Sequence, residues 1–218
     1  MDHAFWHARW QANEIGFHQD EINAHLQRYW PLLDLPSGGI VFVPLCGKSR
    51  DLLWLASRGQ RVLGVEISPI AAAAFFAEND LPVEPIEQDR YVLRRAGEIT
   101  LLQGDYFDLR PADLREVTAV YDRASLIALP PALRARYAAH MASLLPSGVP
   151  VLLVTLDYDQ REMEGPPFAV DTAEVERLFA ADFHVEALDA LDILSENPRF
   201  RARGLTRLSE QVHRLRRR

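Results

Sequence analysis

The stretch IVFVPLCGKS, residues 40–49, decides the fold because a short apolar run rich in β-branched residues ends there in a turn. Residues 40–44 predict a buried strand, and the leucines of residues 49–57 have the spacing of a helix that stops at Gly59. Ligands of open α/β sheets bind beyond the carboxyl ends of the strands. We therefore expect the functional site of this chain at the loop of residues 44–49.

Outward from this stretch, short strands alternate with helical segments. Further strands are predicted at residues 61–66, 99–104, 117–121, 149–156, 185–188 and 205–212, and helices at 70–78, 130–145 and 171–181. Ser68-Pro69 and the DTAE segment at 171–174 resemble helix starts. The alternation predicts an α/β fold with a mostly parallel central sheet and helices on both faces.

Residues 1–35 precede the first predicted strand and are rich in aromatic side chains. That much aromatic area predicts an ordered N-terminal helical cover, which packs on the domain or closes over its ligand site. We expect residues 36–218 to form the core and the whole chain, 1–218, to be a single domain. Its 218 residues, 48% of them hydrophobic and 25% charged, suit one well-filled core.

Composition also excludes several classes of protein. A net charge of −7 argues against nucleic-acid binding, which usually needs a strongly basic face. No apolar run reaches the roughly 18 residues of a membrane span. The single cysteine, Cys46, allows no disulfide within the chain and favours a cytoplasmic location. His3 and His7 have helical spacing but no convincing third ligand, so we expect no metal. Nothing in the sequence suggests an obligate interface, so we expect a monomer.

Three cofactor classes compete for the turn after the first strand. A phosphate-binding loop is suggested by Gly47-Lys48-Ser49, but its first glycine would have to stand where the chain has Phe42. A dinucleotide-binding turn uses three glycines, and only Gly47 is present. S-adenosylmethionine carries no phosphate and needs instead a turn that admits an amino-acid moiety, together with an acid for the ribose.

Two carboxylates fit that third alternative. Glu66 stands at the end of the second strand, where it can accept hydrogen bonds from ribose hydroxyls. Asp105 follows the third strand at a place suited to the adenine edge, with Tyr106 beside it as an apolar face. Each has a structural alternative: Glu66 could stabilise a helix N-terminus, and Asp105 could cap a turn.

Several separated motifs then resemble one known family. They are FVPLCGK (42–48), GVEIS (64–68), YDRA (121–124), GPPF (165–168), and Trp10 with GFHQ (16–19). In this order, over nearly the whole chain, they resemble bacterial-type thiopurine S-methyltransferases of the class I S-adenosylmethionine-dependent superfamily. The resemblance implies a Rossmann-like class I methyltransferase fold.

The resemblance also implies roles for particular residues. The residues expected to contact S-adenosylmethionine are Trp10, Leu45, Glu66, Asp105, Tyr106 and Arg123. Phe17 would line the substrate pocket. Arg199 falls near the place of a second substrate arginine in the family, although Arg201 or Arg203 could take that role.

Methyl transfer from a sulfonium requires alignment of the reacting atoms and exclusion of water more than it requires a base. Arg123 is the candidate catalytic residue, because it could hold an anionic substrate or stabilise a thiolate; an ion pair with Asp122 is the alternative. Cys46 could be an activated nucleophile, but a small buried residue in the cofactor turn is the favoured role.

The expected acceptors are thiopurines and other small aromatic thiols, with selenium or tellurium compounds as further candidates. The alternatives are a non-catalytic protein that binds S-adenosylmethionine and a methyltransferase for another small molecule. The sequence leaves the physiological acceptor and the use of a general base open.

Overall fold

The computed structural model describes residues 3–218, and the chain divides into two compact units. The first unit ends at Tyr121, and the second spans Asp122–Arg218. Each unit combines strands and helices, and the two are described separately below.

The sheet of the first unit has parallel strands at its centre and a hairpin at its edge. Its strands are β1 (Ile40–Val43), β2 (Arg61–Glu66), β3 (Ile86–Glu87), β4 (Val92–Ala96), β5 (Ile99–Gln103) and β6 (Val117–Arg123), of which the last two residues belong to the second unit. Strand β1 pairs in parallel with β2 and β6, and β2 pairs in parallel with β5. Strands β3 and β4 are antiparallel to their neighbours, in the order β3-β4-β5. The carboxyl ends of β1, β2 and β5 therefore lie at one edge.

The helices of the first unit begin at residues suited to that role. They are α1 (His3–Gln11), α2 (Ala24–Tyr29), α3 (Asp51–Ser57), α4 (Pro69–Glu78) and α5 (Pro111–Leu114), with short 3-10 turns at Trp30–Leu33 and Tyr106–Asp108. The Ser68 hydroxyl accepts the Ala71 amide at 3.2 Å, and Pro69 occupies the first turn of α4. The side chain of Asn23 caps α2 through the Leu26 amide at 3.1 Å. The cover expected in residues 1–35 is thus helical.

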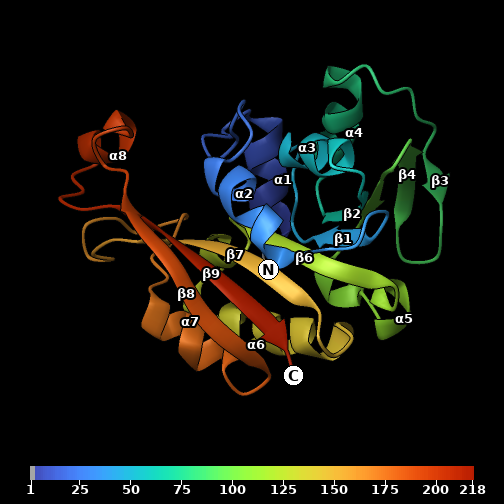
Figure 1. Cartoon of the computed structure of the whole chain (residues 1–218). Helices are drawn as coiled ribbons and strands as arrows, with labels where there is room; N and C mark the ends of the chain where they lie inside the picture. The colour runs from blue at the N-terminus through green and yellow to red at the C-terminus, as the bar shows by residue number, and fades with distance from the viewer. Residues whose placement is uncertain (1–2) are drawn as a thin grey trace. The chain divides into compact units, whose positions relative to one another are not determined.

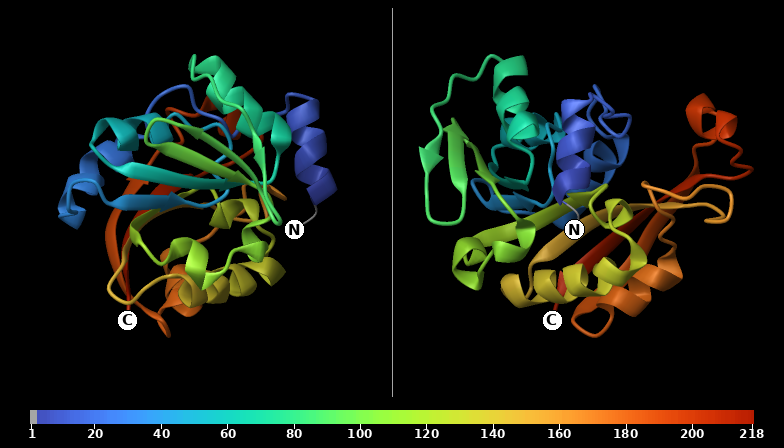
Figure 2. Two further views of the ribbon diagram at one scale, coloured as in Figure 1. Left: turned by 90° about the vertical axis from the view of Figure 1, so that its right-hand side faces the viewer. Right: turned by 180° about the vertical axis from the view of Figure 1, so that it is seen from behind.

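The second unit is built on three long antiparallel strands. They are β7 (Pro150–Asp157), β8 (Phe183–Asp192) and β9 (Ser209–Arg217), with β9 paired to both others. Its helices are α6 (Pro131–Leu144), α7 (Thr172–Phe179) and α8 (Pro198–Ala202), together with a 3-10 turn at Leu126–Ala128. Helices α6 and α7 lie side by side across one face of this sheet, whereas α8 stands beyond its end (Figure 1, Figure 2).

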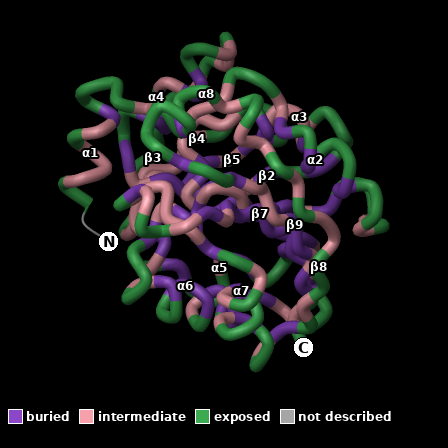
Figure 3. The backbone as a smooth tube through the Cα atoms, turned by 90° about the vertical axis from the view of Figure 1, so that its left-hand side faces the viewer, coloured by how far each residue is buried: buried purple, intermediate pink, exposed green. Residues whose placement is uncertain are grey.

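The cores of both units follow the strands, as the buried stretches of the backbone show (Figure 3). In β7, every residue from Val151 to Leu156 is buried, which agrees with the apolar sequence of that strand. The predicted α/β class, with parallel strands at the centre and helices around them, is confirmed.

Some predicted boundaries are wrong. The last strand is Ser209–Arg217 rather than residues 205–212, because the Leu205 amide donates to the Phe200 carbonyl at 3.2 Å and closes the turn after α8. Helix α8, which contains Arg199, and the β3–β4 hairpin were not predicted.

Candidate cofactor and acceptor site

The turn after β1 has a strained backbone conformation that could not be predicted from its sequence. Leu45 has φ 46° and Gly47 has φ 55°, both in the left-handed region. A positive φ is costly for a side chain such as that of leucine and is found mainly where the surrounding structure enforces it. The Cys46 amide supplies part of that enforcement, because it donates to the Val65 carbonyl of β2 at 3.0 Å.

Glu66 completes the turn from the end of β2. The two oxygens of this buried carboxylate accept different backbone amides, Gly47 N at 2.8 Å and Ser68 N at 2.7 Å. Burial raises the pKa of Glu66, and the hydrogen bonds from Ser68 and Gly47 oppose that rise. Each carboxylate oxygen can accept a further hydrogen bond. The contact of Glu66 with ribose hydroxyls therefore stays a prediction. The structure adds a second role for Glu66, which is to hold the backbone of two turns.

Two aromatic side chains of the N-terminal cover stand over this turn. Trp10 on α1 is buried, and a Cβ atom placed on Gly47 would lie 3.3 Å from its Cζ2 atom. A side chain at position 47 would therefore crowd the indole. Phe17 packs edge-on against Trp10, with ring centroids 5.5 Å apart, and remains 36% exposed. The structure brings these two predicted site residues together with the turn.

Asp105 and Tyr106 follow β5 at the same edge of the sheet. A small cavity is lined by both of them together with Leu45, Val65, Ile67 and Gly104. The Tyr106 ring is buried and stacks on Phe42 of β1, with centroids 6.4 Å apart. Leu45, Asp105 and Tyr106 thus line one small cavity, and their contact with a common ligand stays a prediction.

The Asp105 carboxylate has two partners in the structure. Its Oδ1 atom accepts the Phe107 amide at 2.8 Å, which is the turn-capping role considered above, and its Oδ2 atom lies 2.8 Å from Nε2 of His3. His3 was not predicted as a site residue. Helical spacing showed that His3 could lie on α1, but no sequence signal reveals a contact across 102 positions.

The predicted substrate arginines lie in the second unit. Arg123 ends β6, and Arg199 lies in α8. Burial lowers the pKa of Arg199, and the nearby positive charges of Arg203 and Arg123 lower it further. Arg123 and Arg203 are therefore near enough to Arg199 for their charges to act on it, and Arg203 is one of the alternatives to Arg199.

Asp122, which precedes Arg123, is fully buried. Its Oδ2 atom accepts the Tyr137 hydroxyl of α6 at 2.7 Å. Burial raises the pKa of Asp122 to about 6, although the hydroxyls of Tyr137 and Ser125 oppose the rise. From the sequence, Asp122 was considered only as an ion-pair partner of Arg123, because sequence alone does not show that its carboxyl is buried against a tyrosine.

Cys46 does not have the environment of a nucleophile. The side chain is buried, and that burial, followed by the charge of Glu66, raises the pKa of the thiol well above its ordinary value. Within residues 3–218, no group of three or more potential ligands could hold a metal ion.

The thiopurine S-methyltransferase family matches residues 1–218 of this chain. The chain belongs to that family. The thiopurine S-methyltransferase of Pseudomonas fluorescens (strain Pf0-1) is 53% identical over 216 residues, with 99% of each chain covered. That of Nitrosospira multiformis is 51% identical over 212 residues, which cover 97% of this chain and 96% of the relative. Membership makes the chain an S-adenosylmethionine-dependent methyltransferase.

Solved structures agree with the family at the level of the fold. An S-adenosylmethionine-dependent methyltransferase from Anabaena variabilis has a TM-score of 0.66 at 14% identity and covers 99% of this chain and 95% of its own. The 1,6-didemethyltoxoflavin-N1-methyltransferase of Burkholderia thailandensis, solved with its substrate and S-adenosylhomocysteine, has a TM-score of 0.63 at 18% identity, with coverages of 99% and 86%. In the described part of this family member, no helix is long and apolar enough to cross a membrane.

Proposed function

We propose that this enzyme transfers the methyl group of S-adenosylmethionine to the sulfur of thiopurines and related aromatic thiols. The full-length match to the thiopurine S-methyltransferase family carries the proposal. We include selenium and tellurium oxyanions as candidate acceptors, because a site with several arginines suits small anions.

The first unit offers groups that fit the cofactor. We assign Leu45, Glu66, Asp105 and Tyr106 to its binding, with Trp10 covering the turn. Glu66 and Asp105 can accept hydrogen bonds from ribose and adenine, while Tyr106 and Trp10 provide apolar surface. When bound, S-adenosylmethionine supplies an electrophilic methyl group on a sulfonium. The aromatic rings of Trp10 and Phe17 exclude water and can stabilise a nearby cation.

The second unit offers groups that fit the acceptor. We assign Arg123 to the acceptor and its thiolate, and Arg199 to the acceptor. The positive charges of Arg123, Arg199 and Arg203 favour an ionised thiol, which is the nucleophilic form. Because these charges shift the thiol toward its thiolate, no side chain has to remove the proton at the moment of transfer.

Calorimetric titration with S-adenosylmethionine, followed by a methylation assay, tests the proposal. The assay should include 6-mercaptopurine, a simple aromatic thiol, selenite and tellurite. We expect cofactor binding and turnover of the aromatic thiols. Turnover should be lower in Arg123→Lys, because a lysine keeps the positive charge but lacks the planar set of N–H donors of the guanidinium.

Two other results would redirect the proposal. Cofactor binding without turnover of any acceptor would favour a non-catalytic binder. If selenite or tellurite were methylated and the aromatic thiols were not, the enzyme would be a methyltransferase for another small molecule.

A further inference from the structure

Two segments of the second unit extend beyond the same end of its sheet. One is the 158–169 loop between β7 and α7, which carries the GPPF motif; the other is the α8 segment, residues 193–208, which carries Arg199. The two segments lie side by side (Figure 1, Figure 2). The α8 segment contains Arg199 of the proposed acceptor site, so its position against the 158–169 loop bears on that site.

The 158–169 loop is held by its own hydrogen bonds. The Gln160 side chain donates to the Met163 carbonyl at 2.6 Å and accepts the Ala169 amide at 2.8 Å. The Tyr158 hydroxyl donates to the Pro167 carbonyl at 2.7 Å. These bonds cross the loop from one side to the other, so the loop can serve as a fixed support.

The α8 segment has hydrogen bonds of its own, such as that from the Ile193 amide to the Leu208 carbonyl at 2.9 Å, but its helix is short. Helix α8 spans only Pro198–Ala202, and a helix of that length is unstable by itself in water. Phe200 and Leu205 are its buried anchors. The Arg199 guanidinium carbon lies 4.9 Å from the centroid of the Phe200 ring, and burial, followed by the charges of Arg203 and Arg123, lowers the pKa of Arg199. Contacts from outside the segment therefore add to its support.

Two acidic side chains provide those contacts. The Glu162 carboxylate of the 158–169 loop accepts both the Thr206 amide at 2.9 Å and the Thr206 hydroxyl at 2.6 Å. Asp157, at the end of β7, accepts two hydrogen bonds from the Arg207 guanidinium at 2.7 and 3.2 Å. The bonds from Thr206 lower the pKa of Glu162, so this carboxylate is ionised at neutral pH.

We propose that Glu162 is a positioning residue for the acceptor: by holding Thr206, it fixes the α8 segment, and with it Arg199, against the 158–169 loop. The inference rests on the proposed role of Arg199 in acceptor binding. Glu162 itself need not touch the acceptor, and it is not among the residues of the first unit that we assign to the cofactor. Its removal should therefore weaken acceptor binding and leave cofactor binding unchanged.

Steady-state kinetics of Glu162→Ala with 6-mercaptopurine test this. We expect the KM for the acceptor to rise about threefold to tenfold, as for an exposed hydrogen-bonded pair that positions a binding group, with kcat within about twofold. The Kd of S-adenosylmethionine by calorimetry should not change. Thr206→Val, which keeps the backbone donor, should raise the KM less, and Thr206→Ser should behave as the wild type.

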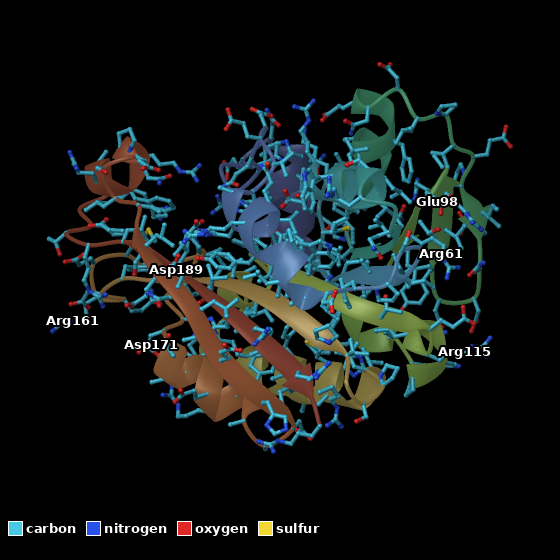
Figure 4. All side chains as sticks on the ribbon, viewed as in Figure 1. Arg61, Glu98, Arg115, Arg161, Asp171 and Asp189 are labelled. Carbon is cyan, nitrogen blue, oxygen red and sulfur yellow. The ribbon has the colours of Figure 1, made fainter. Side chains whose placement is uncertain are left out.

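Arg161→Gln is the matched control. Arg161 is the neighbour of Glu162, its ion pair with Asp159 stays within the loop, and its side chain is 89% exposed and points away from the unit (Figure 4). We expect wild-type kinetics from it. An unchanged KM in Glu162→Ala, an equal effect in the control, or a parallel loss of cofactor affinity would each overturn the proposal.

Hydrogen exchange separates this inference from the proposed function. Amides of residues 198–206 should exchange faster in Glu162→Ala than in the wild type. If the wild-type enzyme turned over no acceptor, the proposed function would fail, and the role of Glu162 in acceptor positioning would fail with it. If turnover were normal but exchange in Glu162→Ala unchanged, the positioning role alone would be wrong.

Discussion

A single carboxylate, that of Glu66, holds two turns of the cofactor site. Because its oxygens accept the amides of Gly47 and Ser68, its removal leaves two donors without their acceptor as well as removing a ribose contact. We predict that Glu66→Ala weakens S-adenosylmethionine binding by about 1–3 kcal/mol. Calorimetric titration measures this directly, and the exposed Glu98, in a loop of the same unit, provides the control variant Glu98→Gln (Figure 4).

The variant Glu66→Gln distinguishes the two roles of this residue. A glutamine can accept from one ribose hydroxyl and donate to the other, but it can accept only one of the two amides through its single oxygen. If organisation of the turns dominates, Glu66→Gln should lose nearly as much affinity as Glu66→Ala. Near wild-type affinity in Glu66→Gln would show that ribose contact is the main role.

Asp122 leads to a prediction about pH. Its pKa in the folded enzyme, about 6, lies above the ordinary value of 3.8, so its protonated form is the stabilising one. That contribution is complete below the ordinary pKa and is lost as the pH rises through about 6. From about pH 4 to about pH 7, the free energy of unfolding of the wild type should fall by about 2 kcal/mol relative to Asp122→Asn. Urea unfolding of both proteins across this range measures the difference, and Asp192→Asn, at an exposed site, should show no comparable trend.

At the scale of elements, the sequence predicted the central strands well and the edges poorly. Strands β1, β2 and β7 are continuous apolar runs, because parallel or central strands are buried on both faces. The β3–β4 hairpin lies at the edge, and its residues are exposed or half-buried, so they lack that signal. Helix α8 has only five residues, too few for a helical period to be visible.

Helices α6 and α7 are joined by a buried ion pair. The Arg134 guanidinium is 2% exposed, lies 2.7 Å from the Glu174 carboxylate and also donates to the Leu129 carbonyl at 2.9 Å. Arg134→Met would leave Glu174 without its counter-charge, which costs about 3–5 kcal/mol for a buried pair. Urea unfolding should show that the free energy of unfolding falls by up to this amount. The loss is smaller to the extent that water can reach the Glu174 carboxylate. Arg177→Met, an exposed change on α7, should stay within about 0.5 kcal/mol of the wild type.

At the scale of the whole molecule, the order of the motifs was more informative than any one of them. A turn with one glycine excluded phosphate-binding loops, but its left-handed Leu45 could not be foreseen, because a positive φ at leucine depends on tertiary contacts. Glu66 ends β2 and Asp105 follows β5, and the topology of the sheet placed both, whereas Trp10 on α1 was placed by the family resemblance. Two contacts could not be predicted from the spacing of residues in the sequence, because they depend on side-chain geometry. They are the contact of His3 with Asp105 and the hydrogen bonds of Glu162 with Thr206.

Binding of the cofactor product should be visible in the stability of the whole chain. A ligand that binds only the folded state at 100 times its Kd adds about 2.7 kcal/mol to the free energy of unfolding. For a chain of this length, S-adenosylhomocysteine should therefore raise the Tm by about 5–10 °C. The same concentration should shift Glu66→Ala much less and Glu98→Gln as much as the wild type. A chelating agent should leave the shift intact, because residues 3–218 contain no cluster of metal ligands. A Tm that does not respond to S-adenosylhomocysteine in the wild type would contradict the assignment of the cofactor site.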